Sequence, residues 1–148
     1  MLRQREVVMQ DFRRLDVWVK AHDLVVILYG ATTTASERRY PGLASQMRRS
    51  ASSIPANIAE GCGHGSQREF ARFLQMALAS AHELHYHLLL ARDLDMLPIA
   101  AFAKLEARTE QVKKMLSSLV ARVRAPLERT VPRRSRPSAP PAAVSRQP

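Results

Sequence analysis

The fold is indicated most clearly by residues 66–91, SQREFARFLQMALASAHELHYHLLLA. Apolar and small residues recur there every three or four positions, which is the spacing of one face of an α-helix. At the start of the segment, the Ser66 hydroxyl can accept a hydrogen bond from the Glu69 amide, and the Glu69 carboxylate can reach back to the Ser66 amide. The segment therefore predicts a capped, long amphipathic helix whose core residues are Phe70, Phe73, Leu74, Ala77, Ala81, Leu84, Leu88 and Ala91.

Two segments before it also have helical spacing. One covers about residues 15–32, and its expected core residues are Leu15, Trp18, His22, Val25 and Tyr29. The other covers residues 43–61, and its expected core residues are Leu43, Met47, Ser50, Ile54 and Ile58. Pro55 lies inside this second helix, so we expect a bend or break between residues 51 and 55. Gly61 suits the left-handed backbone that often ends a helix.

A fourth helix is predicted from Pro98, which suits a first turn, to residue 123. Its apolar residues alternate in steps of three and four, as in a seam that packs along a neighbouring helix, and are Phe102, Leu105, Thr109, Val112, Leu116, Leu119 and Val123. Four helices joined by short loops favour an all-α, antiparallel up-and-down four-helix bundle. We assign residues 1–123 to this domain.

Residues 124–148 differ in composition from the rest of the chain. They hold six of the nine prolines, and six arginines against the single acid Glu128. Such a segment cannot bury enough apolar surface to offset the entropy of ordering it, so we predict a disordered basic tail. The tail carries half of the formal net charge of +10, which favours a polyanionic partner such as nucleic acid.

Other classes of protein are disfavoured by the composition. Cys62 is the only cysteine, which excludes an intrachain disulfide and cysteine-based metal sites within one chain. No apolar segment has signal-peptide or membrane-spanning length, so we expect a cytoplasmic protein with no membrane association.

Short motifs in the predicted helices resemble one known family over about residues 12–97. They are Phe12-x-x-Leu15-x-Val17-Trp18, Gln46-Met47-Arg48-Arg49-Ser50-Ala51-x-Ser53-Ile54-x-x-Asn57-Ile58-Ala59-Glu60-Gly61, Glu69-Phe70-x-x-Phe73-Leu74 and Ser80-x-x-Glu83-Leu84. Together they resemble the four-helix bundle proteins encoded in intervening sequences of 23S ribosomal RNA genes. The chain is also similar to a relative in that family, the accessory variability protein of diversity-generating retroelements.

The resemblance implies a basic homo-oligomer, expected to be a pentamer, that binds nucleic acid without catalysis. The retroelement relative works with a reverse transcriptase and nucleic acid. An alternative function is therefore a protein–protein adaptor that recruits a reverse transcriptase, with the basic surface only steering association. We expect no cofactor in either case.

Three groups of residues could carry chemistry, but each has a simpler interpretation. His82 and His85 are three residues apart, and the sequence supplies no further ligand for a metal, so we expect a solvated or intersubunit histidine face. Cys62 follows a helix C-terminus, where a thiolate is disfavoured, and is expected to be packed. The glycine-rich run from Gly61 to Ser66 lacks the other parts of a nucleotide-binding loop and is expected to be a connector.

Two polar residues lie on or beside the apolar face of the proline-containing helix. Asn57 and Glu60 would be costly to bury without partners, so we expect both to be hydrogen-bonded. Their expected partners are backbone groups near Pro55, or Ser80 and Glu83 on the next helix. An acid–base pair is disfavoured because no nucleophile or metal accompanies them.

Clustered cations are the predicted nucleic-acid contacts. We expect phosphates to be bound at three places in the bundle and in the tail, by Arg48, Arg49, Arg68, Arg72, Lys113, Lys114, Arg133, Arg134 and Arg136. Aromatic residues are only 5% of the chain, so base stacking should be minor. Binding of this kind depends steeply on salt and selects little for sequence.

Overall fold

The computed structural model describes residues 10–32 and 34–130. The described part is helical throughout and contains no β-strand. Its elements are a short 3-10 helix η1 (Phe12–Arg14) and the α-helices α1 (Asp16–Ala31), α2 (Thr34–Arg39), α3 (Pro41–Gly63), α4 (Gln67–Asp93) and α5 (Ile99–Arg129). The four predicted helices are therefore confirmed, and α2 is a short addition in the connection between α1 and α3.

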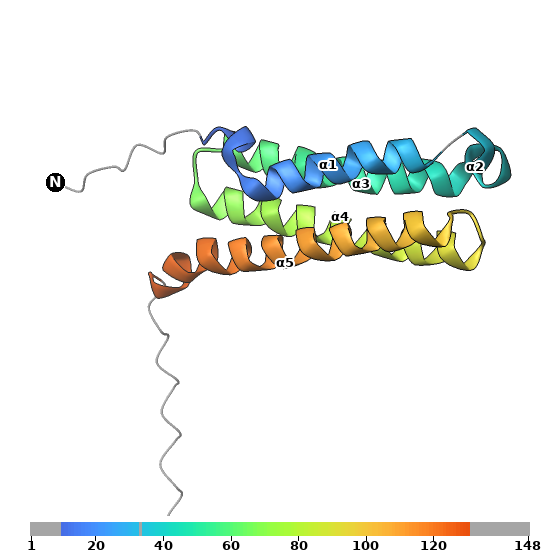
Figure 1. Cartoon of the computed structure of the whole chain (residues 1–148). Helices are drawn as coiled ribbons and strands as arrows, with labels where there is room; N and C mark the ends of the chain where they lie inside the picture. The colour runs from blue at the N-terminus through green and yellow to red at the C-terminus, as the bar shows by residue number, and fades with distance from the viewer. Residues whose placement is uncertain (1–9, 33, 131–148) are drawn as a thin grey trace, which may run out of the picture.

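The four long helices form an antiparallel up-and-down bundle (Figure 1). Each packs on two neighbours, in the cycle α1–α3–α4–α5–α1. One end of the bundle holds η1, the connection from α3 to α4, and the C-terminus of α5. The other end holds α2 and the connection from α4 to α5 (Figure 1). This arrangement confirms the fold predicted from the apolar spacing.

The core face of α4 agrees with the prediction at every position. All eight expected residues, from Phe70 to Ala91, are buried. Ser66 caps the helix, because its Oγ accepts a hydrogen bond from the Glu69 amide at 3.1 Å. The second half of the predicted capping box differs, since the Glu69 carboxylate accepts hydrogen bonds from Arg72 instead.

The core face of α1 was predicted one residue out of register. The structure buries Val17, Ala21, Leu24 and Leu28. Trp18 is only half-buried and stacks on the exposed His22 ring at 5.0 Å, and Tyr29 is 50% exposed. Both sets of residues fit the three-and-four spacing, and the bundle buries the set with the smaller side chains. The aromatic set therefore lies along the outer edge of the helix.

Helix α3 continues through Pro55 instead of breaking there, and it ends at Gly63 rather than Gly61. Asn57 is hydrogen-bonded as expected, donating to the Ser53 carbonyl and to Ser53 Oγ at 2.8 and 3.0 Å. Ser53 Oγ lies 2.9 Å from Ser80 Oγ, which links α3 to α4. Glu60 is exposed and forms no hydrogen bond in the described residues, so its expected hydrogen bond was wrong, and its possible partner Glu83 is exposed as well.

Gly61 has a different role from the predicted one. No described glycine has a positive φ. A Cβ atom on Gly61 would lie 2.8 Å from Phe73 Cβ and 3.2 Å from a ring carbon of Phe70. The missing side chain therefore permits close approach of α3 and α4 near the end of the bundle.

Helix α5 extends six residues beyond the predicted boundary at 123 and includes Pro126. Pro126 costs one backbone hydrogen bond, but the helix ends only one turn later, where few further bonds are lost. Leu127 is half-buried and lines a groove together with α4 residues. The rest of the predicted tail, residues 131–148, lies outside the described part of the chain. Among the described residues, no helix is long and apolar enough to cross a membrane.

Candidate nucleic-acid interface

The structure separates the predicted phosphate contacts into groups with different surroundings. Arg48 and Arg49 lie on α3, Arg68 and Arg72 at the start of α4, and a third pair on α5. The tail residues Arg133, Arg134 and Arg136 lie outside the described residues. Exposure and existing ion pairs decide which of the six described side chains are available to a phosphate.

Arg48 is committed to contacts within the protein. Its guanidinium donates hydrogen bonds to the hydroxyl and carbonyl oxygens of Thr32 and forms an ion pair with Glu37. It also lies over the Tyr29 ring, 5.0 Å from the ring centre. Arg48 therefore satisfies the end of α1 and links it to α2 and α3. Its role as a phosphate contact stays a prediction, and these internal contacts disfavour it.

Arg49 is exposed, but it lines the same surface hollow as Glu37. The hollow has a volume of about 570 Å³ and is also lined by Arg48. A carboxylate at this place opposes the approach of a phosphate. Arg49 alone is thus a weak candidate for binding a polyanion.

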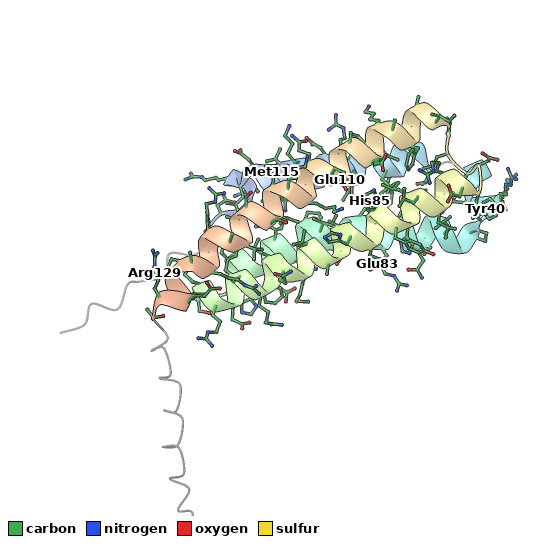
Figure 2. All side chains as sticks on the ribbon, turned by 90° about the horizontal axis from the view of Figure 1, so that it is seen from below. Tyr40, Glu83, His85, Glu110, Met115 and Arg129 are labelled. Atoms are coloured by element: carbon green, nitrogen blue, oxygen red, sulfur yellow. The ribbon has the colours of Figure 1, made fainter. Side chains whose placement is uncertain are left out.

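Lys113 lies in a polar cluster between α4 and α5, where Figure 2 shows His85 facing Glu110. Lys113 Nζ is 2.7 Å from Glu110 Oε1 and 3.1 Å from His85 Nδ1. His85 Nε2 is 3.1 Å from Glu106 Oε1, and His85 Nδ1 is 3.0 Å from Glu110 Oε1. The Lys113 side chain is only 15% exposed. Its role as a phosphate contact stays a prediction, and the contacts with Glu110 and His85 disfavour it.

The same cluster corrects the predicted histidine face. His82 is exposed, whereas His85 is only 22% exposed and faces α5. The hydrogen bond from Lys113 is the main cause that lowers the pKa of Glu110, with the charges of Lys113, His85 and Lys114 adding to it. Among the described residues, no group of three potential ligands is placed to hold a metal.

Lys114 faces the other side of α5, toward α1. It lines a groove of about 450 Å³ together with Arg14 and Arg122. All three cations are exposed, and none has a carboxylate partner among the described residues. Asp16 lines the same groove, which reduces its net charge.

Arg68 and Arg72 line a groove in the described part of the chain. It lies between the start of α4 and the end of α5 and has a volume of about 580 Å³. Arg124 lines it from α5, and Glu128 is the only acid in its lining. Arg72 pairs with Glu69 at 3.0 Å, whereas neither Arg68 nor Arg124 has a carboxylate partner in the described residues. We call this the α4–α5 groove.

Arg14, Arg122 and Arg124 were not singled out from the sequence as site residues. Arg122 lies two helical turns after Lys114, so helical spacing places both on the same face of α5. Arg124 was assigned to the tail because the helix was expected to end at 123. The prediction missed that α5 continues through Pro126, and this continuation places Arg124 on the helix.

Cys62 and the glycine-rich connector, the two remaining candidates, have structural roles. Cys62 is a free thiol, 6% exposed, and burial together with the negative charge of Asp11 raises its pKa. This environment disfavours the thiolate, in agreement with a packed cysteine. The connector between α3 and α4 is short, and His64 within it stacks on the Phe73 ring at 4.8 Å.

Residues 13–118 match the model of the 23S rRNA-intervening sequence protein family. The chain belongs to this family. As a family member, it shares its fold with a solved protein of unknown function from Bacteroides thetaiotaomicron, described as belonging to the S23 ribosomal protein family. The two are 26% identical with a TM-score of 0.65, and the match covers 70% of this chain and 97% of that one. No curated protein matches the chain.

The family match has a boundary that matters for the candidate interface. It includes Arg68 and Arg72 on α4 but ends before Arg122 and Arg124 on α5. The α4–α5 groove of this intervening-sequence family protein therefore combines residues inside the matched range with residues beyond it. The expected similarity to the retroelement accessory protein stays a prediction.

Proposed function

We propose that this protein binds the backbone of RNA or DNA, without catalysis, through the basic end of the bundle. The observation that carries the proposal is the α4–α5 groove, where Arg68 and Arg124 face solvent without a carboxylate partner in the described residues. Arginine suits phosphate because its planar fork donates two parallel hydrogen bonds. Arg129, the last residue of α5, lies at the same end of the bundle (Figure 2), and the sequence after it holds four more arginines.

The direct test is a titration of fluorescently labelled RNA with the full chain at several salt concentrations. Neutralised phosphates release counterions, so the logarithm of affinity should fall linearly with the logarithm of salt. Arg68→Gln and Arg124→Gln should each weaken binding and reduce the slope by about 0.7 to 0.9, the value for one phosphate contact.

Lys104→Gln is the matched control for these variants. Lys104 is an exposed cation near the start of α5, at the other end of the bundle, and it has no carboxylate partner in the described residues. The Lys104→Gln substitution removes the same charge but should leave the slope of affinity against salt nearly unchanged. Equal effects of all three substitutions would show that RNA binding depends on the net charge of the protein rather than on a site in the α4–α5 groove. Undetectable binding at low salt would overturn the proposed function.

Self-association is a second part of the proposal, with a pentamer as the expected state. It is supported by exposed apolar side chains on α1, since Val19, Val26 and Tyr29 are 40%, 58% and 50% exposed. Helical spacing places these three residues on one face of α1, and an exposed apolar patch of this kind is typical of a surface that contacts another protein. Light scattering of the purified chain, alone and as the Val26→Glu variant, tests whether this face joins copies.

The adaptor function draws on the same face of α1. A protein partner such as a reverse transcriptase would occupy exposed apolar residues, and the basic surface would then only accelerate association. The two functions differ in their response to substitution. Arg68→Gln should weaken RNA binding in the first case, whereas Val26→Glu should weaken partner capture in the second.

A further inference from the structure

The lining of the α4–α5 groove is more apolar than a binding site for phosphates alone requires. Besides its arginines, the groove is lined by the apolar residues Ala71, Met76, Ala79 and Leu127, which we call the apolar floor. Met76 is 42% exposed, and Leu127 is half-buried. The volume of about 580 Å³ falls within the range of roughly 300–1,000 Å³ that is usual for pockets holding small organic groups. A ligand that fills this groove therefore offers flat or apolar surface as well as negative charge.

Arginines line the groove from both helices. Arg68 and Arg72 are one turn apart on α4, about 6 Å along the helix axis, and Arg124 faces them from α5. Arg72 lies over the edge of the core, with its guanidinium 4.7 Å from the Phe73 ring centre and its Nη1 3.8 Å from Met76 Sδ. A nucleic-acid strand that crosses the groove from one helix to the other can therefore contact an arginine on each helix.

This combination discriminates between forms of nucleic acid. In a duplex the faces of the bases are stacked inside, and a protein meets only the backbone and the base edges. In a single strand the base faces are free to stack on aromatic or guanidinium surfaces, and an unstacked base can also be held by apolar side chains. The apolar floor cannot contact the stacked base faces of a duplex, but it can hold an unstacked base of a single strand.

Resting on the proposed function, we infer that the α4–α5 groove binds single-stranded nucleic acid, with a base on the floor formed by Met76 and Leu127. The phosphates on either side of that base pair with Arg68 and Arg124. Glu128 also lines the groove and repels phosphates, so it restricts where the backbone can pass. Affinity for a single strand then has two separable parts, one electrostatic and one from base contact.

The test measures binding of a labelled RNA 20-mer, single-stranded and annealed to its complement, to the full chain over a range of salt. The single strand should bind more tightly although the duplex carries twice the charge. The double variant Met76→Ser/Leu127→Ser should weaken single-strand binding about fivefold while leaving duplex binding and the salt slope unchanged. Glu128→Gln should strengthen binding of both forms.

Ile99→Ser is the control for loss of an exposed apolar side chain. Ile99 is 84% exposed and begins α5 at the opposite end of the bundle, so this variant should bind as the parent does. Circular dichroism checks that each variant is folded, and fluorescence of a 2-aminopurine base in the strand reports directly whether a base leaves the stack on binding.

The outcomes separate this inference from the function on which it rests. Equal affinity for both RNA forms, with no effect of the double variant, would overturn the proposed contact between a base and the apolar floor. It would leave the proposed backbone binding intact. Absence of binding to either form would overturn both. Preferential binding of an acidic amphipathic peptide, displaced by neither RNA form, would show that the groove takes a protein partner instead.

Discussion

Arg48 and Arg68 each belong to a cluster of cations in the sequence, yet the fold gives them opposite surroundings. The Arg48 side chain is 24% exposed and is held by Thr32, Glu37 and the Tyr29 ring. Arg68 is exposed in the α4–α5 groove at the other end of the bundle. The first arginine joins three helices, whereas the second presents its charge to solvent. Local charge density alone therefore does not identify a binding residue.

The largest effect should come from removing the arginine that joins the helices. Arg48→Ala leaves the end of α1 and the Glu37 carboxylate without their donor, and should lower the free energy of unfolding by about 2–3 kcal/mol. Urea denaturation measures this. Arg48→Lys should recover only part of the loss, because an ammonium group cannot reproduce the planar fork.

Arg49→Ala is the control for this prediction. Arg49 is the exposed neighbour of Arg48, so its removal should change the free energy of unfolding by less than about 0.5 kcal/mol. If both variants lose the same stability, the helix joint does not depend on Arg48. If Arg48→Ala weakens RNA binding while the protein stays fully stable, the comparison between the two arginines is reversed.

A smaller loss of stability is expected at the groove end of the bundle. Gly61→Ala places a Cβ atom against Phe73 and Phe70, and should lower the free energy of unfolding by about 1–2 kcal/mol. Gly63→Ala is the matched control, since its Cβ would meet nothing within 4 Å. Thermal denaturation of both variants compares the two positions, and equal melting temperatures would contradict the close approach of α3 and α4.

Truncation of the predicted tail tests whether the α4–α5 groove binds RNA without help from the tail arginines. Deleting residues 131–148 removes four arginines and no acid, and leaves the whole of α5 in place. RNA affinity should fall about fivefold and the salt slope should decrease, while the free energy of unfolding stays within about 0.5 kcal/mol. Anisotropy titrations and urea denaturation measure the two effects. An unchanged slope would show that the tail makes no phosphate contacts.

Much of the fold could be predicted because helix spacing is a local property. The core positions of α4 follow from that spacing, since no competing stripe of large apolar residues exists on the helix. On α1 two stripes compete, and the larger side chains of Trp18 and Tyr29 favoured the wrong one. Only packing against α3 and α5 selects the stripe through Leu24.

The site was harder to predict because it depends on contacts between distant residues. Arg48 meets Thr32 across sixteen positions, and Lys113 meets His85 across twenty-eight. Neither separation leaves a local pattern, so a cation with an internal partner looks the same as a free one. Arg68 and Arg72 could be proposed as contacts, but the groove that they line with Arg124 and the apolar floor emerges only when α4 and α5 lie side by side.

The smallest effect should come from Lys113 and its carboxylate partner. The pKa of Glu110 is lowered in the folded protein, so its ion pair contributes stability above the unfolded pKa of about 4.5 and loses it as pH falls through the lower folded value. Because the Glu110 side chain is 39% exposed, solvent screening limits this contribution to about 0.5 kcal/mol. Glu110→Gln should therefore lower the free energy of unfolding slightly at pH 7, and the difference from the parent should vanish near pH 3. Glu128→Gln, at an exposed acid with no ion pair in the described residues, controls for the change in net charge. A difference between Glu110→Gln and the parent that persists at pH 3 would mean that packing, rather than charge, explains the contact between α4 and α5 at this position.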